Sequence, residues 1–304
     1  MSYFNVAVFL ASYNGISWIS EQIDSIVNQE GVNVTIYVSD DISNDGTYNY
    51  LYKLSEFNAQ VKVLSQKVKF GSAGSNFYRL IQDVNISGFD FIAFADQDDI
   101  WESDKLINHI SLAKQHQADG VSSNVIAFWP NGKKRLITKS KPLLKWDFLF
   151  ESAGPGCTFL MTPWLVNSVR NLLVDENSPA KKVVLHDWLT YAVCRAHGRK
   201  WVIDYKPSIQ YRQHENNVIG ANSGLKAKWI RLVKLKQGWY RAEVTKVTKV
   251  CAAISGEAEF RKILALLKSK SIISQLKLLF YASQARRSSS DRLVLFILVL
   301  FFLF

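Results

Sequence analysis

The chain has 304 residues, of which 48% are hydrophobic and 21% are charged. This composition is globular and has room for one large domain with an appendage, or for two domains. The three cysteines are widely spaced, which argues against a disulfide framework or a zinc site and predicts a reducing compartment. The apolar run at 5–11 is too short for a secretory signal and predicts a first strand.

The net charge of +11 is concentrated near the end of the chain. From Leu225 onward there are 16 Lys and Arg residues against four acids, a net charge of +12, whereas the preceding 224 residues carry 21 against 22, a net charge of −1. We therefore predict a neutral body over residues 1–222 and a basic appendage over 223–304. Such an appendage is typical of contact with nucleic acid or with an anionic membrane.

Strand and helix patterns alternate through the first part of the chain. Apolar runs predict strands at 6–11, 34–38, 61–64 and 89–95. Apolar residues at helical spacing predict the helices that follow these strands, at 16–29, 48–57, 76–84 and 101–115. This alternation predicts an α/β fold with a mostly parallel sheet and right-handed crossovers.

The pattern changes after Val121. A strand at 121–129 precedes a hairpin turn at 130–133. A helix is predicted to follow residues 183–188 as far as His197, and two short closing strands at 201–203 and 208–212. Gly154 and Gly156 make a tight turn, which either lets an acceptor approach the backbone or only reverses the chain.

Three carboxylates follow the predicted strand at 89–95 within four residues, at Asp96, Asp98 and Asp99. Like charges this close raise one another's pKa, and a divalent cation removes that cost. Mg²⁺ and Mn²⁺ prefer carboxylate oxygens and keep positions open for water and phosphates. An acidic turn at the carboxyl end of a strand in an open α/β sheet therefore indicates a metal–diphosphate site. The alternative is an acidic loop that caps the next helix, and this stretch alone does not decide between the two.

A second acidic pair, Asp40 and Asp41, ends another predicted strand. A carboxylate there can accept a hydrogen bond from a nucleobase or a ribose, although a single acid would more often cap a helix. Two acidic clusters on neighbouring strands favour a nucleotide site. The G-x-x-x-x-G-K-[ST] and G-x-G-x-x-G patterns are absent from the sequence, which argues against an ATPase and a dehydrogenase.

Five motifs, in this order, resemble those of family 2 glycosyltransferases with the GT-A fold, and in particular the rhamnosyltransferase-like enzymes of bacterial O-antigen and capsule synthesis. The resemblance covers roughly residues 3–222. The motifs are A-S-Y-N-G at 11–15, S-D-D at 39–41 with S-N-D-G-T at 43–47, D-Q-D-D-I-W at 96–101, H-D-W at 186–188, and Y-R-Q-H at 211–214 with Asn216-Asn217 and Ile219-Gly220. One departure is Ile42, where the family usually has Gly. It bears on the turn after Asp41 but removes no chemical group.

The resemblance implies a metal site at the acidic turn. Asp96 and Asp98 match the D-x-D motif that holds Mg²⁺ or Mn²⁺ on the diphosphate of a sugar nucleotide. Asp99 would orient the metal ligands without binding the metal itself. His214 would ligate the metal or contact the diphosphate, whereas a lone histidine is more often a hydrogen-bonded loop residue.

The resemblance also implies a nucleotide site at the ends of the first two strands. Asp40 would read the pyrimidine base, with Tyr13 beside the ring. Asn14 and Asp41 belong to the same two motifs and are expected to contact the nucleotide. Arg212 is expected to contact the diphosphate.

Asp187 matches the catalytic base of the family. It would take the proton from the acceptor hydroxyl as that oxygen attacks the anomeric carbon, which inverts the anomeric configuration. From the residues alone, a helix N-cap would be the preferred interpretation of Asp187.

The basic appendage contains three apolar segments. Apolar and basic residues alternate at helical spacing over 225–241, and a second such helix is predicted over 259–280. Twelve uninterrupted apolar residues end the chain at 293–304. A helix of this length reaches about 18 Å, less than the hydrocarbon core of about 30 Å, so we predict an anchor that lies in the membrane surface. Packing onto the body or onto a second subunit is the alternative.

The charges around the last segment favour a membrane over nucleic acid. Arg286, Arg287 and Arg292 precede the apolar run, and anionic lipid attracts such clusters. The sequence contains no recognisable nucleic-acid module. The predicted location is therefore peripheral, at the cytoplasmic face of the bacterial inner membrane.

Together these features predict an inverting, metal-dependent glycosyltransferase that moves a sugar, with L-rhamnose from dTDP-rhamnose as the first choice, onto a lipid-linked oligosaccharide. Three alternatives remain. One is a hexosyltransferase that uses a UDP-sugar. Another is a non-catalytic membrane-bound scaffold that binds a sugar nucleotide, against which the intact Asp96, Asp98 and Asp187 argue. The third is a nucleotidyltransferase, which would require a basic Gly-rich loop where residues 12–15 are not basic.

Overall fold

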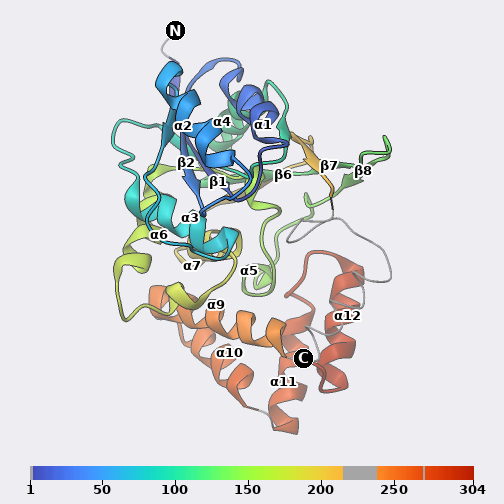
Figure 1. Cartoon of the computed structure of the whole chain (residues 1–304). Coiled ribbons are helices and arrows are strands. Elements are labelled where there is room, and N and C mark those ends of the chain that lie inside the picture. Colours follow the sequence, from blue (N-terminus) through green and yellow to red (C-terminus); the bar gives the residue numbers. More distant parts are fainter. Residues whose placement is uncertain (1–2, 215–237, 270) are drawn as a thin grey trace.

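The structure is a computed structural model that describes residues 3–214, 238–269 and 271–304. A seven-stranded sheet in the order β10-β6-β9-β4-β1-β2-β3 forms its centre (Figure 1). Within it only β9 is antiparallel to its neighbours, which confirms the predicted mostly parallel sheet. Its strands are β1 (Phe4–Ser12), β2 (Val32–Asp40), β3 (Val61–Val63), β4 (Phe91–Ala95), β6 (Gly120–Ser123), β9 (Leu160–Met161) and β10 (Trp201–Asp204).

The register of the central strands brings the two acidic motifs to one edge. All five residues of β4 are buried, as expected for a strand covered by helices on both faces. Ser12 at the end of β1 lies opposite Asp40 of β2, and Leu10 lies opposite Ala95 of β4. The turns that follow β1, β2 and β4 therefore meet at the same edge of the sheet, where open α/β sheets bind ligands.

Helices cover both faces of this sheet. Alternate residues of β1 point to opposite faces, so Val6, Val8 and Leu10 belong to one hydrophobic cluster and Ala7, Phe9 and Ala11 to the other. The first cluster is closed by α1 (Ile19–Val27), α2 (Thr47–Phe57) and α4 (Lys105–His116), and the second by α3 (Ala73–Asp83), α6 (Pro163–Val174) and α7 (His186–Ala196). α6 was not predicted from the sequence.

A smaller four-stranded sheet lies beside the first, in the order β5-β11-β7-β8. Its strands are β5 (Ile100–Trp101), β7 (Val125–Phe128), β8 (Lys134–Ile137) and β11 (Ile209–Arg212). β7 and β8 are antiparallel, which confirms the hairpin at 130–133. The predicted bounds were wrong for two elements, the helix at 101–115 and the strand at 121–129. The helix expected from Trp101 begins at Lys105, because Ile100 and Trp101 pair with β11.

The strand expected at 121–129 is divided into β6 and β7 at Asn124. The side chain of Asn124 is buried and binds backbone groups on two other segments. Its amide nitrogen donates to the Tyr205 carbonyl at 2.7 Å, and its oxygen accepts from the backbone of Lys139 and Ser140 at 2.6 and 2.9 Å. This junction moves the chain from one sheet to the other and ties down the segment that follows β8.

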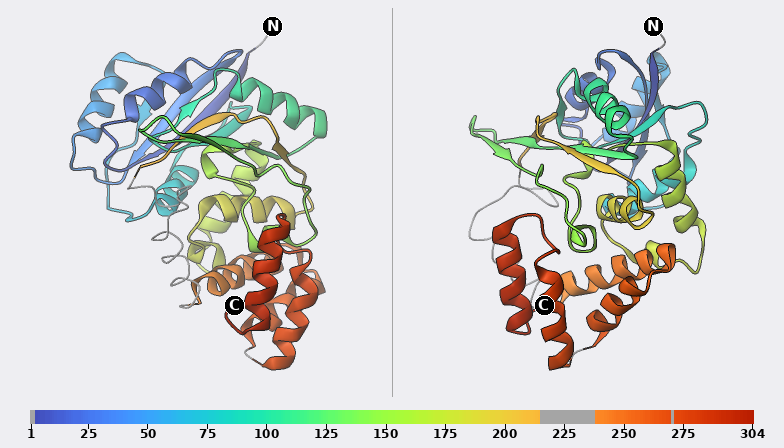
Figure 2. Two further views of the ribbon diagram at one scale, coloured as in Figure 1. Left: turned by 90° about the vertical axis from the view of Figure 1, so that its right-hand side faces the viewer. Right: turned by 180° about the vertical axis from the view of Figure 1, so that it is seen from behind.

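The described part of the chain after residue 237 contains four helices: α9 (Trp239–Ser255), α10 (Ala258–Lys268), α11 (Ile272–Ala282) and α12 (Ser289–Leu300). They form a layer below the α/β body, and α9 packs against it (Figure 2). The single helix predicted at 259–280 is two helices, and Ser271 caps the second by accepting from the Ser274 amide at 3.2 Å. The helix predicted at 225–241 lies outside the described residues except for its last four, of which Gly238 is the N-cap of α9 and the other three open it. The predicted boundary at residue 222 also lies outside the described residues.

A charged joint holds the C-terminal helices against the short helix α5 (Asp147–Phe150). Arg287 is buried, pairs with Asp147 at 3.1 Å and with Glu151 at 3.6 Å, and donates to the Ser152 carbonyl at 2.6 Å. Arg286 pairs with Glu151 and Asp291 at 3.6 and 3.1 Å. The sequence argument that assigned these two arginines to anionic lipid was therefore wrong, because the body supplies their counter-charges.

Candidate active site

The acidic turn after β4 is largely buried. Asp99 is fully enclosed and Asp98 nearly so. Burial, together with the neighbouring charges of Asp98 and Asp187, raises the pKa of Asp96 to about 7. The carboxyl of Asp99 also has a pKa well above its usual range, because of burial and of Asp98 and Asp96. The turn thus brings together carboxyl groups whose ionisation is disfavoured, and a bound cation would favour their charged forms.

Two residues from the end of β11 close over this turn. The Nε2 atom of His214 lies 2.6 Å from the Asp98 carboxylate, and its ring stacks on Trp18 at 4.2 Å. Arg212 donates from Nε to the Asp98 carbonyl at 2.8 Å and from its backbone N–H to Asp99 at 3.1 Å. Its guanidinium also pairs with Glu21. The structure therefore places Arg212 as a brace of the acidic turn, and brings His214 and Asp98 together as a metal site requires.

The residues of the turn fit a hard divalent cation. Asp96 and Asp98 offer carboxylate oxygens and His214 an imidazole, a combination suited to Mn²⁺ or Mg²⁺. A second grouping, in which ligand atoms of Asp96, Asp99 and Cys157 lie within 4.8 Å of one another, is less suitable. Asp99 and Cys157 are fully buried, and a thiolate favours softer metals. We therefore regard Asp99 and Cys157 as supports for the turn.

Gln97, within the acidic turn, joins it to the end of β1. Its side-chain amide accepts from the Tyr13 N–H at 2.7 Å and donates to the Tyr13 carbonyl at 2.9 Å. Gly15 passes so close that an added Cβ would lie 2.3 Å from the Gln97 side-chain oxygen. The Tyr13 ring is left half exposed, and the Lys69 ammonium lies 5.0 Å from its centre. Tyr13 is thus displayed at the mouth of the site, as a base-stacking residue requires.

The acids at the end of β2 are occupied in holding loops. Asp40 accepts hydrogen bonds from the Ser12 hydroxyl at 2.9 Å, from the Ser43 N–H at 2.9 Å and from the Gln66 amide at 2.7 Å. Asp41 accepts from the backbone N–H groups of Phe70 and Gly71. These two acids order the loops at 42–46 and 65–71 that surround Tyr13. A base contact by Asp40 would join or replace one of these bonds.

The turn at 42–45 is held in an unusual conformation. Asn14 and Ile42 both have positive φ, at 50° and 57°. Asn14 accepts from the Asn44 N–H at 2.9 Å through its side chain, and its own N–H donates to the Ser43 hydroxyl at 2.8 Å. Asn14 therefore fixes the conformation of the turn beside Tyr13 in the candidate site. Ile42, the one departure from the family pattern, is a β-branched residue in a conformation that glycine adopts freely.

Asp187 lies in the first turn of α7, and it is not the N-cap, which is Leu185. Its carboxylate accepts from the Trp188 N–H at 2.8 Å. Burial raises the pKa of Asp187 to about 6, against the opposing effects of hydrogen bonds from Trp188 and Ser152 and of the Lys139 charge. A carboxylate with this pKa is ionised at neutral pH and remains a good proton acceptor.

Close packing of the neighbouring residues fixes the position of Asp187. The neighbouring His186 ring stacks on Phe77 at 3.9 Å, and burial lowers its pKa to about 3, so it is neutral. A Cβ at Gly156 would lie 2.7 Å from His186 Nε2 and 3.2 Å from the Asp187 Cβ. The glycine turn therefore allows the backbone to approach the candidate base, which is a steric role.

Several residues of the site were not identified from the sequence. Gln97 lies within the motif at 96–101, but a glutamine there does not by itself predict the hydrogen bonds to Tyr13. Ser152 and Lys139 come from segments with no motif, and only the fold brings them to Asp187. Lys105 is fully buried, with its ammonium 3.4 Å from the centre of the Trp101 ring, and burial lowers its pKa to about 7, although the neighbouring Cys157 and Asp99 oppose that effect. A lysine at the start of an amphipathic helix gives no sign of such burial.

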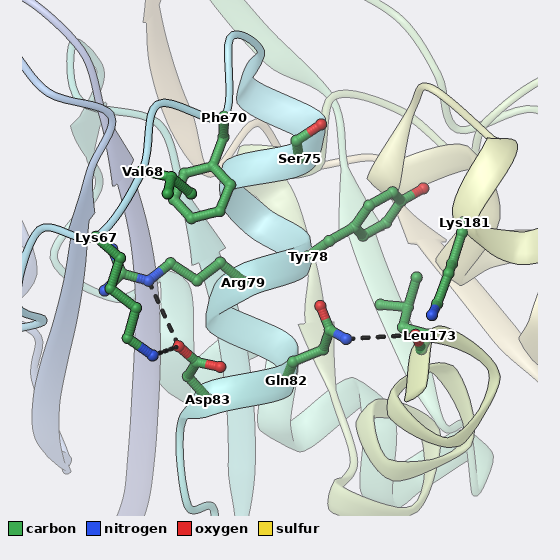
Figure 3. Close-up of a pocket in the computed structure, with 10 residues that line it drawn as sticks. All are labelled: Lys67, Val68, Phe70, Ser75, Tyr78, Arg79, Gln82, Asp83, Leu173 and Lys181. Carbon is green, nitrogen blue, oxygen red and sulfur yellow. Dashed lines mark hydrogen bonds and ion pairs between the residues drawn. The ribbon is translucent and has the colours of Figure 1, made fainter. Parts of the chain in front are cut away.

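A separate pocket of about 440 Å³ lies on the outer face of α3 (Figure 3). There Asp83 pairs with Lys67 at 3.3 Å and with Arg79 at 3.5 Å, and Tyr78 and Lys181 line the far side. None of the candidate site residues lines it. We therefore place the chemistry at the sheet edge.

Comparisons with known proteins identify the family. Residues 7–159 match the model of glycosyl transferase family 2. The dTDP-rhamnosyl transferase RfbG of Shigella flexneri is 43% identical over 245 residues, 80% of this chain and 84% of that protein. The Escherichia coli protein WfgD, a UDP-Glc:alpha-D-GlcNAc-diphosphoundecaprenol beta-1,3-glucosyltransferase, is 29% identical over 53% of this chain and 62% of its own length.

Solved structures share the fold at low identity. Staphylococcus aureus TarS 1–349 in complex with UDP-GlcNAc superposes with a TM-score of 0.54 at 16% identity, over 98% of this chain and 82% of that one. The mannosyltransferase PcManGT of Pyrobaculum calidifontis, solved with GDP-Man and Mn²⁺, gives 0.53 at 15%, over 98% and 85%. These likenesses confirm the GT-A-like fold. The family match and the 43% identical relative show that the chain belongs to glycosyl transferase family 2 and is a glycosyltransferase.

Proposed function

We propose that this glycosyltransferase moves L-rhamnose from dTDP-rhamnose to a lipid-linked glycan, with inversion at the anomeric carbon. The observation that carries the proposal is the approach of Asp187 to the acidic turn. The two segments are about 90 residues apart, yet the charge of Asp187 raises the pKa of Asp96. A candidate base therefore lies within electrostatic range of the candidate diphosphate site.

The proposed chemistry is a single displacement. Asp187 accepts the proton of the acceptor hydroxyl while that oxygen attacks the anomeric carbon. The bond from the anomeric carbon to the phosphate oxygen breaks, and the nucleoside diphosphate leaves from the opposite face. Asp96, Asp98 and His214 would hold Mg²⁺ or Mn²⁺, which when bound neutralises the leaving diphosphate. Tyr13 would stack on the base, within loops that Asp40 and Asp41 order.

The identity of the donor rests on the relatives. RfbG, which matches over four-fifths of this chain, is named a dTDP-rhamnosyl transferase. The acceptor class is suggested by WfgD, whose name specifies a sugar on diphosphoundecaprenol. A UDP-sugar donor is the second candidate, because WfgD uses UDP-Glc according to its name.

We also propose that the enzyme works on a membrane surface. None of the described helices is both long and apolar enough to cross a bilayer. α11 and α12 contact each other, and these helices and the three residues after α12 expose large apolar side chains: Ile272, Ile273, Leu276, Phe280, Leu293, Val294, Phe296, Ile297, Leu300, Phe301, Phe302 and Leu303. A patch of this kind on a basic segment suits a monotopic contact with anionic lipid.

The donor is tested by release of nucleoside diphosphate from a panel of sugar nucleotides, with Mn²⁺, with Mg²⁺ and with EDTA. We expect dTDP-rhamnose to turn over in the presence of a lipid-linked acceptor, and EDTA, Asp98→Ala and Asp187→Asn each to abolish turnover. Turnover of another donor alone would overturn the rhamnose assignment. Full activity in EDTA would overturn the proposed metal dependence.

The membrane surface is tested by sedimentation with vesicles of phosphatidylethanolamine and phosphatidylglycerol. The double variant Phe280→Ser/Phe301→Ser should remain in the supernatant, while Phe57→Ser, which removes an exposed phenylalanine from α2, should sediment like the wild type. Equal sedimentation of all three proteins would contradict the proposed surface.

A further inference from the structure

One acid of the basic appendage is buried against the α/β body. Glu243 lies near the start of α9, which packs on α7 (Figure 1), and its side chain is fully enclosed. One carboxylate oxygen pairs with Lys246, three residues further along the helix. The other accepts a hydrogen bond from the backbone N–H of Val184 at 3.0 Å. Because a buried carboxylate is costly unless its oxygens are bound, this contact ties α9 to the chain at Val184.

Val184 is held by contacts of its backbone, since the residue is 43% exposed and its side chain gains little from packing. Its carbonyl oxygen lies against α3, so that a Cβ at Gly74 would be 2.1 Å from it. The carbonyl of Val183, one residue earlier, accepts a hydrogen bond from the Tyr78 hydroxyl at 2.9 Å. Two contacts from α3 and one from α9 therefore fix the path by which the chain enters α7.

This path determines where the candidate base lies. Asp187 follows Val184 by three residues and stands in the first turn of α7. The N-cap of this helix, Leu185, is apolar and makes no side-chain hydrogen bond to it. Since side-chain caps commonly hold the first N–H groups of a helix, the start of α7 depends on the contacts of the residues before it. A change in the direction of the chain at Val184 would move the Asp187 carboxylate with the helix.

α9 also contacts the residue that follows the candidate base. Tyr240 lies three residues before Glu243 and therefore on the same face of α9. Its ring stacks on that of Trp188, with the ring centres 6.1 Å apart, and its hydroxyl donates to the Phe150 carbonyl at 2.7 Å. The start of α9 therefore holds the chain on both sides of Asp187.

We propose that Glu243 is a positioning residue for Asp187, and that the C-terminal helices complete the active site in addition to making the proposed membrane contact. This inference rests on the proposed function, because it takes Asp187 as the base. Glu243 touches neither the donor nor the acceptor in this proposal and acts through the backbone of Val184. The appendage, whose charge predicts a membrane-associating tail, would thus also set the geometry of the transfer step.

The experiment compares variants of the full chain in neutral detergent, with the lipid-linked acceptor and the sugar nucleotide of the panel above that turns over fastest. Glu243→Met keeps most of the side-chain volume but removes the acceptor, whereas the amide oxygen of Glu243→Gln still accepts from Val184. Thr248→Val is the matched control. It removes a buried hydroxyl of α9 whose hydrogen bond, to the Val244 carbonyl at 2.7 Å, stays within the helix.

For Glu243→Met we expect kcat to fall by about tenfold to 100-fold, the effect of displacing a catalytic group by about 1 Å. The donor KM should stay within about twofold of wild type, because the acidic turn and Tyr13 lie on other elements. Glu243→Gln should restore most of the loss in kcat, and Thr248→Val should behave as wild type.

Hydrogen exchange follows the same contact without any need for activity. The readouts are the amide of Val184 and that of Leu189, which donates to the Leu185 carbonyl at 3.0 Å and closes the first turn of α7. Both should exchange faster in Glu243→Met than in the wild type and in Glu243→Gln. Unchanged exchange at these two amides would overturn the proposal, whatever the activity.

The kinetic results can overturn it as well. An unchanged kcat in Glu243→Met would do so, and so would an equal loss in Glu243→Gln and Glu243→Met, which would make the charge important and not the hydrogen bond. An equal loss in Thr248→Val would mean that any loosening of α9 has the same effect. Full activity of Asp187→Asn would instead overturn the proposed function, and the exchange rates would still show whether Glu243 holds the start of α7.

Discussion

The pKa values of single residues in this site depend on the balance between the loss of solvation and the contacts that each side chain makes. Asp187 is the example with the clearest chemical consequence. Removing the carboxylate from water raises its pKa to about 6, and hydrogen bonds from Trp188, Ser152 and its own backbone, together with the charge of Lys139, oppose that effect. The same burial that makes ionisation costly makes the carboxylate a better base at neutral pH.

We expect kcat/KM for the acceptor to fall as pH drops through about 6, by about tenfold for each further unit, because protonated Asp187 cannot accept a proton. Asp187→Asn should lower kcat by about 10²–10⁴ at pH 7.5 without lowering the melting temperature, since it removes a poorly solvated charge. Asp24→Asn, on the exposed face of α1, is the control. A pH profile without inflection between 5 and 7 would mean that another group is the base.

Ile42 is the residue whose backbone conformation conflicts with its side chain. Its φ of 57° crowds a β-branched side chain that is largely exposed and gains little from packing. Ile42→Gly should raise the unfolding free energy by about 1 kcal/mol, with Ile42→Asn in between, as read from denaturant titrations. Ile16→Gly, at an exposed isoleucine without positive φ, should lower it. A loss of stability in Ile42→Gly would show that the turn is not strained.

At the scale of elements, the far end of the loop at 65–71 is held by one carboxylate. Asp41 accepts hydrogen bonds from the backbone N–H groups of Phe70 and Gly71, whereas Gln66, at the start of the loop, binds Asp40. Lys67, in the same loop, makes an exposed ion pair with Asp83. The hydrogen bonds to Asp41 are partly buried and directed at the backbone. Surface ion pairs such as Lys67–Asp83 contribute about 0–1 kcal/mol.

We therefore expect Asp41→Ala to speed hydrogen exchange at the Phe70 and Gly71 amides and to raise the KM for the donor, because Lys69 and Tyr13 would no longer be held together. Lys67→Ala should leave both measurements within about twofold of wild type, since it removes only the surface pair. Similar exchange rates in the two variants would indicate that the loop is held by its packing and not by Asp41.

At the scale of the whole molecule, the C-terminal helices are joined to the body by both apolar and charged contacts. α9 buries Val244, Val247, Val250 and Cys251 in the cluster that also contains α7. Arg287 then spans the joint, paired with Asp147 and hydrogen-bonded to the carbonyl of Ser152. Since Ser152 also contacts Asp187, the joint and the candidate base share one loop.

Arg287→Ala should lower the unfolding free energy by about 3 kcal/mol, because it leaves buried acids without their counter-charge. Arg261→Ala, at an exposed arginine of α10, should change it by less than about 0.5 kcal/mol. Chemical denaturation monitored by tryptophan fluorescence provides both values. A change in Arg287→Ala no larger than in Arg261→Ala would mean that apolar packing alone holds the helices on the body.

By itself the sequence determined the alternation of strands and helices and the acids at the strand ends. These are local properties: a buried parallel strand must be apolar, and a polar turn must follow it, whatever the rest of the chain does. Hence β1, β2, β4 and α1–α3 were predicted near their observed bounds, and Asp96, Asp98 and Asp187 were located by motif.

Only the tertiary structure decided which distant groups meet. The break at Asn124, the pairing of β5 with β11, and the approach of Ser152 and Lys139 to Asp187 depend on contacts between segments far apart in the chain. The same holds for Arg286 and Arg287, whose charges suggest lipid in the sequence but meet acids in the fold. The energy of a charge depends on its solvation and its neighbours, and neither is encoded in the residues on either side of it.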